Sequence, residues 1–170
     1  MPRSFDMAAE YEGSVEQVYR AFGDERYWLA RLAGSGADKT TLDAMETTAD
    51  GGIDVVTTQT LRADRLPAVV GQFHHGDLSF VREETWGPLA DGRATAVVKG
   101  SIPGAPATLA GTAVLRHAYD GVGARLEFSA TVEVRIPLVG GKVENFVGNQ
   151  LVDLLIAEQR FTTEWINDNT

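Results

Sequence analysis

Residues 140–168 read GGKVENFVGNQLVDLLIAEQRFTTEWIND and decide the fold, because apolar residues recur there at helical spacing. The pattern begins at residue 138, so we predict one helix over 138–168. At about 1.5 Å rise per residue, this helix measures roughly 45 Å. Its apolar stripe comprises Val139, Val143, Phe146, Val147, Leu151, Leu154, Ala157, Phe161 and Trp165. So long a stripe must be buried, and we expect it to lie against the inner face of a sheet.

The preceding residues supply that sheet, because their hydrophobic period is mostly two. Strands are predicted at 3–12, 40–50, 51–62, 77–86, 94–102, 107–119 and 124–136. Turn signals rich in Gly, Pro and Asp separate the later strands, which indicates antiparallel pairing. Two short helices follow the first strand: SVEQVYRAFG, with Ser14 and Gln17 as a capping box, and ERYWLARLA, capped by Asp24.

One segment interrupts the strands. ADRLPAVVGQFHHG, residues 63–76, is too apolar for a plain loop, and we expect a short helix or lid that starts near Pro67. The chain contains no linker, low-complexity segment or internal repeat, so residues 1–170 are predicted to form one domain.

Composition excludes several classes of function. The 170 residues are 44% hydrophobic and 23% charged, which is typical of a folded globular protein. A net charge of −9 disfavours nucleic acid and anionic membranes as partners. With no cysteine, the chain has no disulfide, thiol nucleophile or thiolate metal site. The first residues lack a signal-peptide core, and no stretch approaches the roughly 20 apolar residues of a membrane span. We therefore expect a cytoplasmic protein without integral membrane association.

The order of one strand, two short helices, a series of antiparallel strands and a long C-terminal helix resembles the START-like superfamily, also called SRPBCC or helix-grip. Within it, LPAVVGQF, VREETW and the closing helix resemble an uncharacterised actinobacterial branch, described as polyketide-cyclase-like or of unknown function. The resemblance covers essentially the whole chain. It implies an α+β fold in which a curved sheet of about six to seven strands wraps around the last helix. It also implies a cavity, used across the superfamily for lipids, sterols, polyketides, hormones and, in some branches, catalysis.

Two polar residues, Gln150 and Glu158, fall within the apolar stripe of the last helix. A buried, unpaired carboxylate is costly, so Glu158 must approach solvent at the edge of the stripe or meet a partner. The alternative is that both residues are polar contact points in a cavity.

The strand LSFVREETW can turn either of its two faces towards the interior of the fold. One face carries Leu78, Phe80, Arg82, Glu84 and Trp86. If it points inward, Arg82 and Glu84 can bind a carboxylate or hydroxyl of a ligand or act in acid–base chemistry. If it points outward, they are solvated cross-strand charges. Charged runs on sheets usually face solvent, which favours the outward arrangement, whereas Trp86 favours the inward one.

No metal or cofactor motif is present. His74 and His75 are adjacent in the segment 63–76, so in extended chain they point apart, and His117 lies on a strand. No GxSxG elbow, P-loop or complete GxGxxG occurs. We expect no metal and no cofactor, while His74 remains able to protonate a ligand at a cavity mouth.

Three hypotheses about function follow. The first is a protein that binds a hydrophobic or amphipathic small molecule, lipid-like, sterol-like or polyketide-like, between the sheet and the last helix. Its ligand-binding candidates are Trp28, Leu66, Val70, Phe73, Arg82, Glu84, Trp86, Phe128, Gln150, Leu154, Glu158 and Phe161. The second is a polyketide cyclase, dehydratase or hydrolase with Glu84 or Glu158 as acid or base and Arg82 or His74 steadying negative charge. The third is a chaperone-like or regulatory module that uses an exposed apolar patch.

Overall fold

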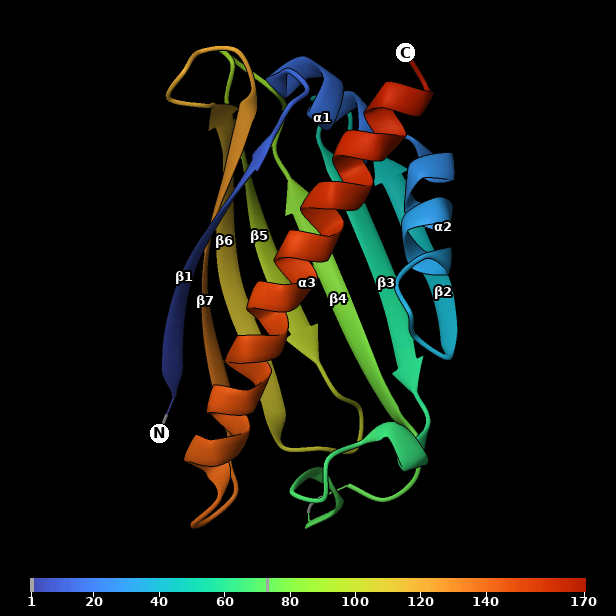
Figure 1. Ribbon diagram of the computed structural model, residues 1–170, viewed down its shortest axis with the longest axis vertical. Helices are drawn as coiled ribbons and strands as arrows, with labels where there is room; N and C mark the ends of the chain where they lie inside the picture. Colours follow the sequence, from blue (N-terminus) through green and yellow to red (C-terminus); the bar gives the residue numbers. More distant parts are fainter. Residues whose placement is uncertain (1, 73) are drawn as a thin grey trace.

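The computed structural model describes residues 2–72 and 74–170, and their elements alternate much as the sequence predicts (Figure 1). In chain order they are β1 (Arg3–Tyr11), α1 (Val15–Phe22), α2 (Glu25–Ala33), β2 (Lys39–Thr47), β3 (Ile53–Leu61), the short 3₁₀ turns η1 (Ala63–Arg65) and η2 (Val70–Gln72), β4 (Leu78–Trp86), β5 (Ala94–Ser101), β6 (Ala107–His117), β7 (Ala124–Val134) and α3 (Gly140–Asp168).

The strands form one antiparallel sheet among the described residues, seven strands wide, in the order β1-β7-β6-β5-β4-β3-β2. Figure 1 shows α3 running diagonally across one face of this curved sheet, with α1 and α2 covering one end. The helix-grip architecture is therefore confirmed. Because β1 and β2 stand at opposite edges, the sheet curves around α3 without closing into a barrel.

The short helices begin where the sequence predicts, because side chains satisfy their first backbone N–H groups. The Gln17 amide donates to Ser14 Oγ over 3.1 Å, and the Ser14 amide donates to Gln17 Oε1 over 2.9 Å. The Arg26 amide donates to Asp24 Oδ1 over 2.9 Å at the start of α2. The apolar faces of α1 and α2 then join the larger hydrophobic core, under the C-terminal half of α3.

Helix α3 approaches β1 and β7 through small residues. A Cβ placed on Gly148 would collide with the ring of Phe5, so only glycine permits this approach. The buried side chain of Glu144 fixes the first turns, because its Oε2 accepts a 2.9 Å hydrogen bond from the Val134 amide. Among the described helices, none is both long enough and apolar enough to cross a membrane.

The predicted helix stripe is rotated from the face that α3 actually buries. Gly148, Thr162 and Ile166 are buried, whereas Ala157, a predicted stripe residue, is exposed. Leu154 is only half-buried. The physical reason is that the glycines and Thr162 let the backbone come close to its neighbours, so the larger side chains lie beside the contact rather than at its centre.

The segment 63–76 contains two 3₁₀ turns instead of one helix from Pro67. Glycines at 71 and 76, the latter with φ of 85°, favour turns over a sustained helix. The segment is tethered to the loop after α2, since Arg65 Nη1 lies 3.0 Å from Asp38 Oδ1. The residue just before the segment adds a second contact, because the Arg62 amide donates to Asp38 Oδ2 over 2.7 Å.

Candidate functional site

A groove lies between the N-terminal half of α3, the strands facing it and the segment 63–76. It consists of two adjacent cavities of about 380 and 390 Å³. Both fall in the size range of small-molecule sites. The two cavities share the lining residues Leu61, Arg65, Leu78, Ile102, Val147 and Gln150. The shared lining places these mainly apolar cavities side by side along α3, and together we call them the groove.

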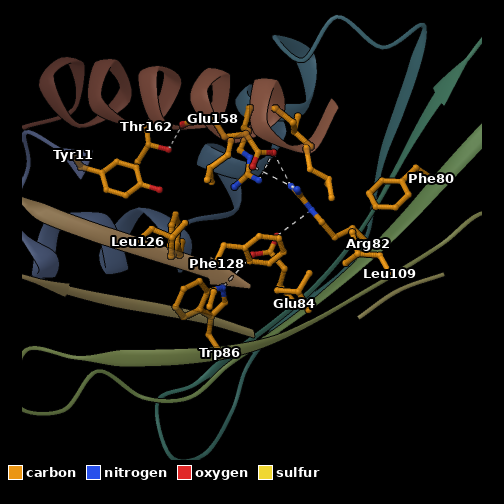
Figure 2. A pocket seen from close by; sticks show the side chains of 17 residues that line it. Tyr11, Phe80, Arg82, Glu84, Trp86, Leu109, Leu126, Phe128, Glu158 and Thr162 are labelled. Atoms are coloured by element: carbon orange, nitrogen blue, oxygen red, sulfur yellow. Dashed lines mark hydrogen bonds and ion pairs between the residues drawn. The ribbon is translucent and has the colours of Figure 1, made fainter. Parts of the chain in front are cut away.

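A third cavity adjoins the wider two deeper under α3, and we call it the narrow end of the groove. This end leaves about 60 Å³, enough for a few atoms, and shares Phe80, Leu151 and Leu154 with the wider part. Its walls carry four charged side chains: Arg31, Arg82, Glu84 and Glu158. We call these four residues the charge cluster, and Figure 2 shows this end of the groove.

Arg82 links the two carboxylates of the charge cluster. Its Nη2 lies 2.8 Å from Glu158 Oε2 and its Nη1 lies 3.4 Å from Glu158 Oε1, a bidentate contact. Its Nε lies 3.3 Å from Glu84 Oε2. Arg31 forms a second ion pair with Glu158, and the Trp86 indole donates to Glu84 Oε1 over 3.2 Å. Each charge therefore has a partner, which is what makes its burial tolerable.

The two arginines decide the protonation state of Glu158. Burial alone would raise the pKa of this carboxyl, but the attraction of Arg31 and then Arg82 outweighs burial and lowers the pKa to about 2. Glu158 is therefore ionised at neutral pH, with both oxygens engaged.

Arg31 is held in place by α2 and α3. Its guanidinium lies 4.6 Å from the centre of the Trp28 ring, a cation–π contact. Its Nη1 donates to the Tyr27 hydroxyl over 3.3 Å. That hydroxyl lies 2.6 Å from Thr162 Oγ1, which in turn donates to the Glu158 carbonyl over 2.7 Å. The arginine is thus ordered before any ligand arrives.

Tyr11, at the end of β1, adds a hydroxyl to the narrow end. Its side chain is buried, at 5% exposure, and Figure 2 shows its hydroxyl pointing into the space between α3 and the sheet. Within residues 2–72 and 74–170, that hydroxyl forms no hydrogen bond. Burial raises its pKa far above the ordinary value, so it stays protonated and can donate.

The charged residues of β4 favoured an outward orientation for Arg82 and Glu84, and the structure corrects this prediction. Arg82 and Glu84 point into the grip, with side chains 11% and 12% exposed, and Trp86 is buried beside them. The outward arrangement is wrong because α3 and α2 supply opposite charges, so burial does not leave either group unpaired. Glu158 has the partner that a buried carboxylate requires.

The other candidates are distributed along the groove. Phe128 and Leu154 line the narrow end, Gln150 lines both wide cavities, and Leu66 and Val70 line the wide cavity beside the segment 63–76. Trp28 and Phe161 instead border a smaller cavity on the far side of Arg31. Phe73 lies outside the described residues.

His74 is not part of this site. Its Nε2 donates to the Asp77 carbonyl over 2.7 Å, and it lines none of the cavities described above. Within the described chain, no three His, Asp or Glu side chains are grouped so that they could hold a metal ion.

Sequence patterns missed Tyr11, Arg31 and Thr162 as members of the site. Tyr11 looked like one more apolar position of an alternating strand. Arg31 gave a faint signal, a charge amid the aromatic and apolar residues of YWLARLA. Only the packing of β1, α2 and α3 on one another brings the three together.

Solved structures with this fold include enzymes. An aromatase/cyclase from Streptomyces sp. R1128 is 9% identical with a TM-score of 0.64, over 98% of this chain and 94% of the other. Norcoclaurine synthase from Thalictrum flavum is 12% identical with a TM-score of 0.57, over 100% and 89%. At such low identity, these likenesses establish the START-like, helix-grip fold alone.

Closer relatives are mycobacterial. An uncharacterised protein of Mycobacterium tuberculosis is 52% identical over 173 residues, which cover 99% of each chain. A family described as "protein of unknown function" (DUF2505) matches residues 6–166, from β1 almost to the end of α3. The chain therefore belongs to the DUF2505 family.

Proposed function

We propose that this protein binds an amphipathic small molecule, lipid-like, sterol-like or polyketide-like, in the groove. The adjacency of the three cavities supports the proposal, because mainly apolar side chains line them from the segment 63–76 to a buried polar end. The apolar body of the ligand would occupy the wide part and its polar end would reach the narrow part. In norcoclaurine synthase the same fold was solved with dopamine and hydroxybenzaldehyde, which supports the idea by analogy of fold only.

Burial of apolar surface alone can supply enough free energy to bind a ligand that carries no net charge. Burying about 300 Å² of ligand surface at roughly 25 cal/mol per Å² gives about 7 kcal/mol before the costs of association. We expect the ligand to enter and leave at the wide end, beside the segment 63–76, because the contacts that hold this region to Asp38 lie at the surface.

The alternative, a polyketide cyclase, dehydratase or hydrolase, is supported by the fact that Arg82, Glu84 and Glu158 line one cavity. Two observations weaken it. Glu158, with a pKa near 2, is a poor general acid or base at neutral pH. His74 lies outside this space and is engaged with the Asp77 carbonyl.

The interaction-module alternative needs an extended apolar surface. The large apolar side chains exposed on the described residues are scattered over α2, β5, α3 and two loops: Leu29, Val97, Tyr119, Val122, Leu138, Val152 and Ile156. Because these side chains are scattered, they support an interaction module less well than the groove supports ligand binding.

Titration with the neutral, apolar dye Nile red tests the proposal. Leu151→Trp puts a bulky indole ring between the wide and narrow parts, whereas Val152→Trp places the same ring on the exposed side of α3. We expect Leu151→Trp to lose about tenfold or more in affinity and Val152→Trp to bind as the wild type does. Native mass spectrometry of gently purified protein, beside a denatured sample, should reveal a co-purifying lipid-like molecule.

A second variant guards against loss of folding. Gln150 lines the wide part but is itself exposed, so Gln150→Trp fills the mouth without entering the core. If Nile red does not bind the wild type, or binds both groove variants with unchanged affinity, the proposal is wrong.

A further inference from the structure

On the basis of that proposed function, we propose that the ligand's polar end is an uncharged oxygen, a carbonyl or a hydroxyl, and that the Tyr11 hydroxyl binds it. The inference names the chemical class of the ligand and the residue that selects it. Three features of the narrow end carry it.

The first feature is the unpartnered hydroxyl of Tyr11. Buried polar groups in proteins are nearly always hydrogen-bonded. The Tyr11 side chain is 5% exposed, and its hydroxyl has no hydrogen-bond partner in the described chain because its oxygen opens onto the space that a ligand would enter (Figure 2). A carbonyl or hydroxyl oxygen placed there would accept the missing hydrogen bond.

The second feature is the charge balance of the narrow end. Arg31 and Arg82 are matched by Glu84 and Glu158, and ion pairs already join them. A carboxylate entering this space would meet two carboxylates that hold the same arginines, and an ammonium group would meet two arginines. Neither would recover the solvation it loses on burial, whereas an uncharged oxygen has much less solvation to lose.

The third feature is size. The narrow end offers about 60 Å³, compared with about 380 Å³ in the adjoining wide part. At roughly 10–15 Å³ for each water-sized group, this volume holds about four or five heavy atoms but not a sugar or choline head group. The ligand therefore enters with a small polar end and leaves its bulk in the apolar part.

A displacement experiment with ligands of matched chain length tests this inference. Nile red bound to the full-length protein is displaced at pH 7 by dodecan-1-ol, 2-dodecanone, dodecanoate or dodecylamine. We expect the alcohol and the ketone to bind about tenfold more tightly than the two charged compounds. Tyr11→Phe should lower the affinity for the alcohol and the ketone by about threefold to tenfold, measured after correction for any change in the affinity for Nile red, which itself carries a carbonyl oxygen.

Tyr119→Phe is the matched control, because its hydroxyl is on an exposed side chain outside the groove and its loss should change none of these affinities. If dodecanoate or dodecylamine binds as tightly as the alcohol, or if Tyr11→Phe weakens all four compounds equally, the inference is wrong while the proposed function stands. If Nile red and all four compounds fail to bind, both are wrong.

Discussion

The guanidinium of Arg82 on β4 makes a bidentate contact with the carboxylate of Glu158 on α3, at 2.8 and 3.4 Å. The contact joins the middle of the sheet to the helix that it wraps. Arg82 and Glu158 line both the narrow end of the groove and a second cavity of about 60 Å³, which Arg31 borders as well. We therefore expect the pair to stabilise the fold, and in the proposed function it borders the polar end of the ligand.

Removing Arg82 should destabilise the fold. Arg82→Met keeps much of the apolar stem but leaves Glu84 without its ion-pair partner and Glu158 with only one arginine. We expect a loss of about 2–4 kcal/mol in the free energy of unfolding, measured by urea denaturation. Arg135→Met is the control, since Arg135 is 70% exposed beside Glu133 and its pair should contribute little. Equal effects in the two variants would show that the buried pair has no special role.

Stability should fall in acid because of Glu158. Its pKa is lowered from 4.5 to about 2 in the folded protein, so the unfolded chain takes up a proton first as the pH decreases. The stabilisation is complete above the unfolded pKa and is lost as the pH falls from about 4.5 towards 2. Urea denaturation across this range should show a steeper decline for the wild type than for Glu158→Gln. Glu164→Gln, an exposed change on the same helix, should retain the wild-type slope.

Alanine at position 148 should weaken the packing of α3. Gly148→Ala places a methyl group against the ring of Phe5, and we expect a loss of about 1–3 kcal/mol from overpacking. Gly141→Ala meets only the end of the Arg3 side chain at 3.7 Å, so the higher helix propensity of alanine should leave stability unchanged or raise it. Thermal unfolding of the two variants measures the difference, and a harmless Gly148→Ala would mean that α3 can move away from β1.

The tether of the segment 63–76 should control ligand exchange. Arg65 pairs with Asp38 and donates to the Gly36 carbonyl over 2.9 Å, while its side chain lines the wide part of the groove. Arg65→Gln should accelerate the dissociation of Nile red by about twofold to fivefold, as expected for the loss of a surface ion pair. Stopped-flow fluorescence gives the rate. Arg26→Gln, which removes an exposed pair away from the groove, should leave it unchanged.

The element order was predictable because its signals are local. The capping box of Ser14 and Gln17, the turn signals between the strands and the helical period after residue 138 each act within a few residues. By contrast, the segment 63–76 was only partly predicted, because its length and apolarity resemble those of a helix while its glycines favour turns.

The site was predicted only in outline. Glu158 stood out because a carboxylate within an apolar stripe needs a partner, but no local pattern identified Arg31 or Arg82 as that partner. The facing of Arg82 was undetermined, since a shift of one residue along a strand reverses both faces. Pairing of β4 with β3 and β5 fixes that register, opposite Thr57 and Gly100.

By itself, the sequence determined the strands, the helices and their order, because hydrophobic period, caps and turns are properties of neighbouring residues. The tertiary structure alone decided that Tyr11, Arg31, Arg82 and Glu158 face one space. That convergence depends on long-range register and on the close approach of α3 through Gly148, and neither is encoded in any single stretch of the chain. A buried charge is stable only where such an approach supplies its partner.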